Sequence, residues 1–188
     1  MEVNFSPPAS DINSKRLDKG KRLITGLAYA EKFAPSHIMT VDADDCVSSY
    51  LAEFVSQNQD SNGWFIDKGY IYRENRKFIY FRSKAFSQLC GSGLIVKYSN
   101  NFNYLFENDI YNHKVKCLGD GNLLEPLPFI GAVYIIGNGE NIYLNLEKLN
   151  YLTKTLKQKG LIFYLRDFLQ YRWLTKSIRK QFNLFQLN

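Results

Sequence analysis

An apolar run that ends in a cluster of carboxylates constrains this chain most. Ile38 to Val41 predicts a short buried strand, and Asp42, Asp44 and Asp45 follow it directly. Open α/β sheets bind ligands outside the carboxyl ends of their strands, where carboxylates can hold Mg²⁺ or Mn²⁺ and a substrate's phosphates. If the extended conformation continues, Asp42 and Asp44 lie on the same side. The run predicts a metal and phosphate site; the alternative is a strand-end turn and the N-terminal charges of a helix.

The composition indicates one folded domain. The chain has 188 residues, 45% of them hydrophobic, and no apolar run approaches the roughly 20 residues of a membrane-spanning helix. Residues 1–8 show no signal-peptide pattern, and the three cysteines are widely spaced without a CxxC pair. We therefore expect a cytoplasmic protein without a zinc site or a disulfide framework. The net charge of +6 favours an anionic ligand, nucleic acid or an anionic membrane surface.

Apolar periodicity predicts helices and strands along most of the chain. Helices are expected over 22–34, after Ser48 or Ser49, and over 108–118, where the helix would carry His113. The expected strands cover 38–41, 64–66, 70–72, 77–81, 94–96 and 130–136. The predicted fold class is α/β, with helices on both faces of a mixed sheet.

The C-terminal part is expected to be helical over about 145–185, with basic and aromatic residues interleaved. We predict an α/β domain over 1–144 and a helical extension of the same domain over 145–188. The extension either covers the sheet with snorkelling basic residues or attaches to an anionic membrane surface or a partner. No nucleic-acid-binding motif accompanies these residues, so no specific nucleic-acid partner is expected.

Three segments together resemble a GT-A glycosyltransferase of the large inverting family. They are Asp18-Lys19-Gly20-Lys21 with the helix after it, Ile38-Met39-Thr40-Val41-Asp42-Ala43-Asp44-Asp45, and Gly91-Ser92-Gly93-Leu94-Ile95-Val96-Lys97. In that family a lysine-bearing segment precedes a helix, and an apolar strand then ends in an Asp-X-Asp motif. The resemblance implies a partial GT-A (nucleotide-diphospho-sugar transferase-like) mixed sheet with flanking helices and a C-terminal helical extension.

The family has two further strands that hold the nucleotide base, and no counterpart is found ahead of Val3. We therefore expect a truncated or partial nucleotide pocket in this chain. The sheet edge left without those strands predicts a homodimer or pairing with another chain.

The resemblance also implies roles for single residues. Asp42 and Asp44 would bind Mn²⁺ or Mg²⁺, with His113 completing the metal shell, and the metal would neutralise the leaving diphosphate. Lys19, Lys21 and Asp42 would contact the nucleotide-sugar donor. An inverting transfer to an acceptor hydroxyl also needs a carboxylate base, and the candidates are Glu107, Asp109 and Asp120.

Two other functions stay open. In a phosphohydrolase of the haloacid dehalogenase type, Asp42 would be the nucleophile, Asp44 the acid/base, and 119–122 the acidic metal loop. Alternatively, the chain is a non-catalytic remnant or an interaction module that keeps the fold without the activity. A transferase would bind a nucleotide sugar only with divalent metal, and a phosphatase would hydrolyse a small phosphoester.

Overall fold

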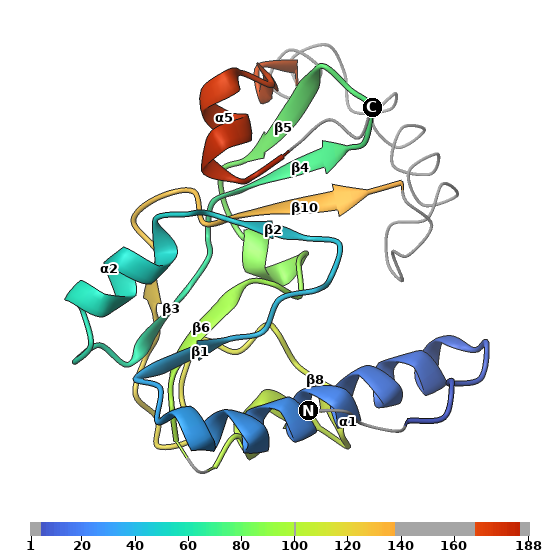
Figure 1. Cartoon of the computed structure of the whole chain (residues 1–188), viewed down its shortest axis with the longest axis vertical. Helices are drawn as coiled ribbons and strands as arrows, with labels where there is room; N and C mark the ends of the chain where they lie inside the picture. The colour runs from blue at the N-terminus through green and yellow to red at the C-terminus, as the bar shows by residue number, and fades with distance from the viewer. Residues whose placement is uncertain (1–4, 100, 138–167, 185–188) are drawn as a thin grey trace.

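Three β-sheets and the helices beside them make up the part of the chain that this computed structural model describes, residues 5–99, 101–137 and 168–184 (Figure 1). Helix α1 (Ile12–Ala30) lies along one end of the molecule, and α5 (Lys176–Gln181) lies at the other. The mixed sheets and their helices agree with the predicted α/β class.

The first sheet has four strands in the order β1 (His37–Met39), β6 (Leu94–Lys97), β3 (Gly63–Phe65) and β9 (Glu125–Pro126). Strand β1 is antiparallel to β6, which is antiparallel to β3, and β3 runs parallel to β9. Strand β1 therefore forms one edge of this sheet. It is shorter than the expected strand over 38–41, because Thr40 and the exposed Val41 lie outside it. Its three residues are half-buried, whereas a buried strand was expected.

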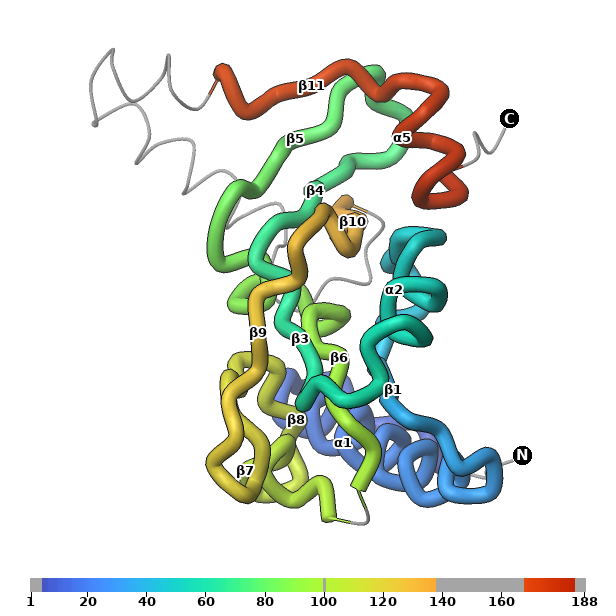
Figure 2. The backbone as a smooth tube through the Cα atoms, turned by 90° about the vertical axis from the view of Figure 1, so that its left-hand side faces the viewer, coloured from blue at the N-terminus to red at the C-terminus, as the bar shows by residue number. Residues whose placement is uncertain are grey.

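The second sheet has five strands in the order β11 (Tyr171–Trp173), β5 (Phe78–Arg82), β4 (Gly69–Arg73), β10 (Ala132–Ile136) and β2 (Cys46–Val47). Strands β10 and β4 are parallel, and the other neighbours are antiparallel. Figure 2 shows β4, β5 and β11 at the end of the molecule away from α1. The strand predictions over 64–66, 70–72, 77–81, 94–96 and 130–136 are confirmed to within two residues at each end.

A two-residue hairpin replaces the helix expected over 108–118. Strands β7 (Phe106–Glu107) and β8 (Ile110–Tyr111) pair across Asn108 and Asp109, whose φ angles are 50° and 62°. Asn and Asp tolerate this left-handed backbone better than most residues, and two consecutive positive φ angles are typical of a hairpin turn. The helix prediction was wrong because it overlooked this turn.

Helix α1 begins ten residues before the expected helix over 22–34 and ends at Ala30, where a short 3₁₀ turn, η1 (Glu31–Phe33), follows. The Asp11 side chain caps its first turn by accepting hydrogen bonds from the backbone amides of Asn13 and Ser14, at 3.0 and 2.9 Å. The polar segment before residue 22 is therefore part of the helix and not a lead-in to it.

Helix α2 (Leu51–Gln57) follows the acidic cluster and has Tyr50 at its N-cap without a side-chain hydrogen bond. The expected cap by Ser48 or Ser49 is wrong, although the Ser48 hydroxyl accepts a hydrogen bond from the Tyr50 amide at 3.3 Å. Two further 3₁₀ turns, η2 (Phe86–Gln88) and η3 (Asn103–Leu105), precede β6 and β7.

Most of the expected helical extension over 145–185 lies outside the described residues. Within its described part, Tyr171–Trp173 form strand β11 and not a helix, and α5 follows after a Thr175 cap. Strand β11 extends the second sheet by pairing with β5, so these residues belong to the sheet they were expected to cover. In the part of the chain that the structure describes, no helix has the length and apolar character needed to cross a membrane.

Three groups of buried side chains fill the interior. One gathers around Trp64, Ile66 and Phe86 between the two larger sheets, another around Ile79 and Phe182 beneath β5 and α5, and a third around Leu94 and Leu105. The loop from β1 to β2, which carries the acidic cluster, joins the first sheet to the second.

Candidate functional site

The carboxylate of Asp42 meets the ammonium group of Lys19 where the loop after β1 approaches α1. Both side chains are about one-third exposed, so the pair is partly accessible to solvent. Lys19 Nζ also lies 5.9 Å from the centre of the Tyr111 ring. Two of the residues expected to contact a nucleotide sugar, Lys19 and Asp42, are thus brought together.

The Gly91-Ser92-Gly93 segment lies against the same ion pair. A Cβ atom at Gly91 would lie 2.7 Å from Asp42 Oδ2 and 3.0 Å from Lys19 Nζ, closer than ordinary contacts allow. The Ser92 hydroxyl accepts a hydrogen bond from the Asp42 amide at 2.9 Å. The three segments that carry the family resemblance, 23 to 50 residues apart, therefore converge.

Asp45 fixes the acidic loop from the inside. It is buried, and its carboxylate accepts hydrogen bonds from the Ser92 hydroxyl at 2.6 Å, the Cys90 thiol at 3.1 Å and the Ile135 amide at 3.2 Å. Burial raises the pKa of Asp45, and these three hydrogen bonds oppose the rise. Asp45 thus ties the loop to the segment before β6 and to β10.

Sequence reasoning placed Asp45 in the acidic cluster but assigned it no separate role. It also missed Ser92 and Cys90 as partners of that cluster. The small-residue run 91–93 was the only signal in the sequence. The local sequence around Ser92 does not indicate that its hydroxyl bonds to Asp45, which lies 47 residues earlier.

The acidic loop turns instead of continuing the strand. The Asp45 amide donates a hydrogen bond to the Asp42 carbonyl at 3.0 Å, so residues 42–45 form a turn. The extended conformation on which the shared side of Asp42 and Asp44 depended therefore does not continue, and the expected alternative of a strand-end turn is what the structure has. Asp44 is half-buried at this turn.

His113 and Tyr111 close the site from the β8 side. His113 Nδ1 lies 2.7 Å from the Ser87 carbonyl oxygen. Because a carbonyl oxygen can only accept a hydrogen bond, Nδ1 carries the proton, and in the neutral ring Nε2 has a free lone pair. Burial lowers the pKa of His113, the Ser87 carbonyl opposes this, and the charge of Lys19 lowers it further. The Thr40 hydroxyl donates to Tyr111 Oη at 2.6 Å, which ties β8 to the end of β1.

The donor atoms fit Mg²⁺ or Mn²⁺ in kind. Asp42 and Asp44 offer hard carboxylate oxygens, and a histidine whose other nitrogen is held by a carbonyl is a typical metal ligand. Among residues 5–99, 101–137 and 168–184, however, no three His, Cys, Asp or Glu side chains lie close enough together to hold a metal ion. Metal binding would require Asp42 to exchange Lys19 for the ion.

The remaining predicted residues are spread around this centre. Lys21 is exposed on α1 two residues from Lys19, a spacing that points it to another face of the helix. Glu107 and Asp109 are exposed beside the β7–β8 turn, and Asp120 accepts hydrogen bonds from Asn122 in its own exposed turn. Across the described segments, no hydrogen bond or ion pair joins these four side chains to Lys19 or Asp42.

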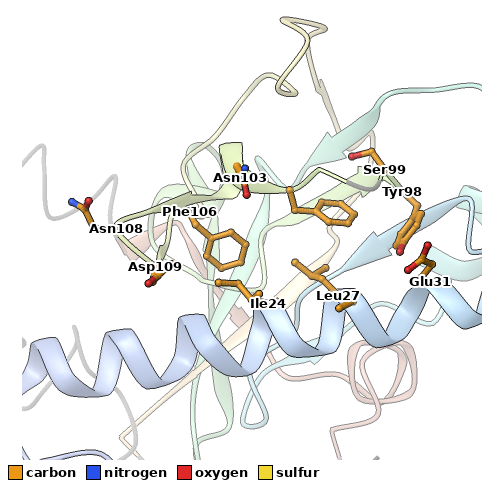
Figure 3. A pocket seen from close by; sticks show the side chains of 11 residues that line it. Ile24, Leu27, Glu31, Tyr98, Ser99, Asn103, Phe106, Asn108 and Asp109 are labelled. Atoms are coloured by element: carbon orange, nitrogen blue, oxygen red, sulfur yellow. The ribbon is translucent and has the colours of Figure 1, made fainter.

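A groove of about 510 Å³ runs beside α1 between the helix and residues 98–109 (Figure 3). Its floor is apolar, with Ile24, Leu27 and Phe106, and acidic side chains lie towards its ends, Asp109 at one and Glu31 at the other. Of the three predicted base candidates, Glu107, Asp109 and Asp120, Asp109 is the one that lines this groove.

A comparison of the chain with protein-family models, with curated proteins and with solved structures gives no match.

Proposed function

We propose that the chain is a GT-A-type, metal-dependent glycosyltransferase that transfers a sugar from a nucleotide-sugar donor to an acceptor hydroxyl. The observation that carries the proposal is the convergence of Lys19, the Asp42-Ala43-Asp44 turn and Gly91-Ser92 at one partly open site. A chance match of three short motifs would not require them to meet in space. A metal-dependent diphosphate site uses carboxylates as metal ligands and often a Lys or Arg beside them, and Asp42, Asp44 and Lys19 are residues of these kinds.

Each residue at the site has a role in this proposal. Asp42, Asp44 and His113 would have to move closer together to hold the Mn²⁺ or Mg²⁺ ion, because no three such side chains of the described residues lie close enough in this structure. The charge of the bound ion would stabilise the leaving diphosphate. Lys19, released from Asp42, contributes a second positive charge to the same diphosphate. Asp45 and Ser92 keep the acidic turn in place. Gly91 leaves the space directly beside the ion pair free of a side chain.

Asp109 is the best placed of the three base candidates. It lines the groove beside α1, whereas Asp120 is engaged by Asn122 in its own turn. The main chain of Asp109 also packs on Gly20, the residue next to Lys19. An acceptor in the groove would thus lie along the same helix that carries Lys19.

The second candidate is a non-catalytic remnant or interaction module. The observation that favours it is the Lys19–Asp42 ion pair itself, which satisfies the Asp42 carboxylate without a metal. The edge position of β1 also leaves backbone hydrogen-bonding groups that a partner could pair with.

Calorimetric titration separates the two candidates. UDP-sugars and GDP-sugars are titrated into the chain with Mn²⁺ and again with a chelator, for wild type and for Asp44→Ala. A transferase site should bind one donor only with metal, and Asp44→Ala should weaken that binding at least tenfold, because it removes one ligand of the ion. The exposed Asp60→Ala is the matched control and should bind like wild type.

Absence of donor binding by folded wild type, shown by an unchanged circular dichroism spectrum and a cooperative unfolding transition, would overturn the transferase proposal. The remnant or interaction module would then stand.

A further inference from the structure

Exposed aromatic and aliphatic side chains gather at the end of the molecule opposite α1. Phe78, Phe168, Leu169, Tyr171 and Trp173, which we call the β5–β11 patch, are between 44% and 73% exposed. Figure 2 shows β11 next to β5 at this end, with α5 following β11. Monomeric proteins rarely leave large apolar side chains this close together in water without a binding role.

The pairing of β11 with β5 explains why these rings share one face. Trp173 is opposite Phe78 and Tyr171 is opposite Tyr80, with ring centres 4.3 and 5.2 Å apart. Ile79, between Phe78 and Tyr80 in the strand, points to the other face and is buried in the core. The patch is therefore held by a hydrogen-bonded strand pair and does not depend on a ligand for its shape.

The same end of the molecule concentrates positive charge. Residues 73–84 and 168–184 carry nine Lys and Arg side chains and a single acidic one, Glu74. The whole chain has a net charge of +6, so the rest of the sequence is slightly negative. Positive charge is thus concentrated in these two segments, although residues 15–22 of α1 also carry five Lys and Arg side chains and one Asp.

Helix α5, whose end packs through Phe182 on the Ile79 side of the sheet, carries two of these charges at the same end of the molecule. Lys176 and Lys180 are exposed and four residues apart, which places them on one face of the helix. Phe182 and Leu184, just after the helix, are buried in the core, and the Ser49 amide donates a hydrogen bond to the Gln181 carbonyl at 2.9 Å. The charges therefore have a fixed position relative to the patch.

We propose that the β5–β11 patch docks the protein onto an anionic phospholipid membrane, with Trp173, Tyr171 and Phe168 entering the headgroup region. Tryptophan and tyrosine favour the membrane–water interface, and clusters of four to eight Lys and Arg residues bind anionic lipid surfaces. This inference does not depend on the proposed transferase activity, because no residue of the patch belongs to the site around Asp42.

The patch suits a membrane better than a nucleic acid. Nucleic-acid platforms stack bases on open ring faces, but Phe78 and Trp173 each turn one face to the other. Leu169, 66% exposed, offers neither stacking nor hydrogen bonding and gains only from an apolar environment.

Vesicle binding tests the proposal through tryptophan fluorescence. Trp64 is buried and Trp173 is 64% exposed, so quenching by brominated lipids reports on Trp173. The wild type should co-sediment with vesicles of phosphatidylcholine and phosphatidylglycerol, and its fluorescence should be quenched there. It should bind pure phosphatidylcholine vesicles weakly, and binding to anionic vesicles should fall as salt is added.

Matched variants assign the binding to the patch. Lys176→Glu/Lys180→Glu should weaken partitioning to anionic vesicles about tenfold or more. Phe168→Ser/Leu169→Ser should weaken it without changing its salt dependence. Lys15→Glu/Lys32→Glu makes the same change of charge at exposed positions at the α1 end, and should bind within about twofold of wild type.

Three results would overturn the proposal. The first is equal binding to anionic and neutral vesicles, or no binding, by the folded wild type. The second is polynucleotide binding that the patch variants abolish while vesicle binding stays unchanged. The third is a dimer in light scattering that only the patch variants disrupt, which would assign the patch to a second copy of the chain.

Discussion

At the scale of single residues, Ser92 connects the backbone of Asp42 to the carboxylate of Asp45. Its hydroxyl accepts from the Asp42 amide at 2.9 Å and donates to the buried Asp45 carboxylate at 2.6 Å. Asp42 faces the open side of the site, while Asp45 faces the interior. The buried Ser92 hydroxyl therefore fixes the position of Asp42, which a ligand would contact, relative to the buried Asp45 carboxylate.

Replacing Ser92 by alanine should destabilise the fold by about 1–3 kcal/mol, because Asp45 loses its shortest hydrogen bond and the Asp42 amide loses its acceptor. The free energy of unfolding measured in urea checks this. Ser83→Ala, at an exposed serine, is the control and should change stability by less than about 0.5 kcal/mol. Equal stability of both variants would show that the Ser92 hydrogen bonds contribute nothing measurable.

At the scale of elements, the two glycines of α1 have different surroundings. A Cβ atom at Gly20 would lie 1.7 Å from the Asp109 carbonyl oxygen, so the β7–β8 turn rests directly on this helix position. At Gly26 a Cβ atom would meet nothing within 4 Å. The glycine next to Lys19 thus allows the hairpin to approach the site.

The two glycines should respond oppositely to alanine. Gly26→Ala should stabilise the protein by up to about 1 kcal/mol through helix propensity alone. Gly20→Ala should destabilise it by about 1–3 kcal/mol or more, because the hairpin or the helix must move. Urea unfolding of both variants measures the difference. Stabilisation by both substitutions would mean that the hairpin does not pack on α1.

The sequence predicted the strands better than the connections between them. Runs such as 70–72 and 94–96 carry enough β-branched and aromatic residues to identify a strand locally. The β7–β8 turn was mistaken for the start of a helix because Asn and Asp, the residue types at 108 and 109, occur both in hairpin turns and at helix N-termini. The extra ten residues of α1 were missed because its first half is polar and its stability comes from the Asp11 cap and the hairpin packed upon it.

For the candidate site, the sequence predicts Asp42, Lys19 and His113 as site residues, and it gives no indication of the hydrogen bonds that hold this region together. Asp45, Ser92 and Cys90 act through tertiary hydrogen bonds between residues more than 40 positions apart, and no local pattern encodes such pairs. The position of Trp173 on a strand instead of a helix was likewise decided by its partner β5.

At the scale of the whole molecule, the edge strand β1 and the β5–β11 patch belong to different sheets at different ends of the fold. One sheet edge offers backbone hydrogen-bonding groups near the acidic turn. The other end offers aromatic side chains and positive charge. Association through one end therefore leaves the other accessible.

The β1 edge should support a homodimer, because an unpaired edge strand is a template for pairing with a second chain. Light scattering over a range of protein concentrations should show a mass that rises from monomer to dimer. Val41→Lys, at an exposed position just after β1, should weaken the dimer, whereas Phe168→Ser/Leu169→Ser should leave it unchanged. A monomer at every concentration would contradict the prediction.

The acidic turn lies early in the chain, but the partners that hold it come late. Asp45 bonds to Cys90, Ser92 and Ile135, and β2 beside it pairs with β10, which begins at Ala132. On a ribosome, which builds the chain from its N-terminus, residues 42–45 emerge long before anything can fix them. The acidic turn therefore cannot have all of its partners before residue 135 has been synthesised, and contacts this distant in sequence are typically slow to form.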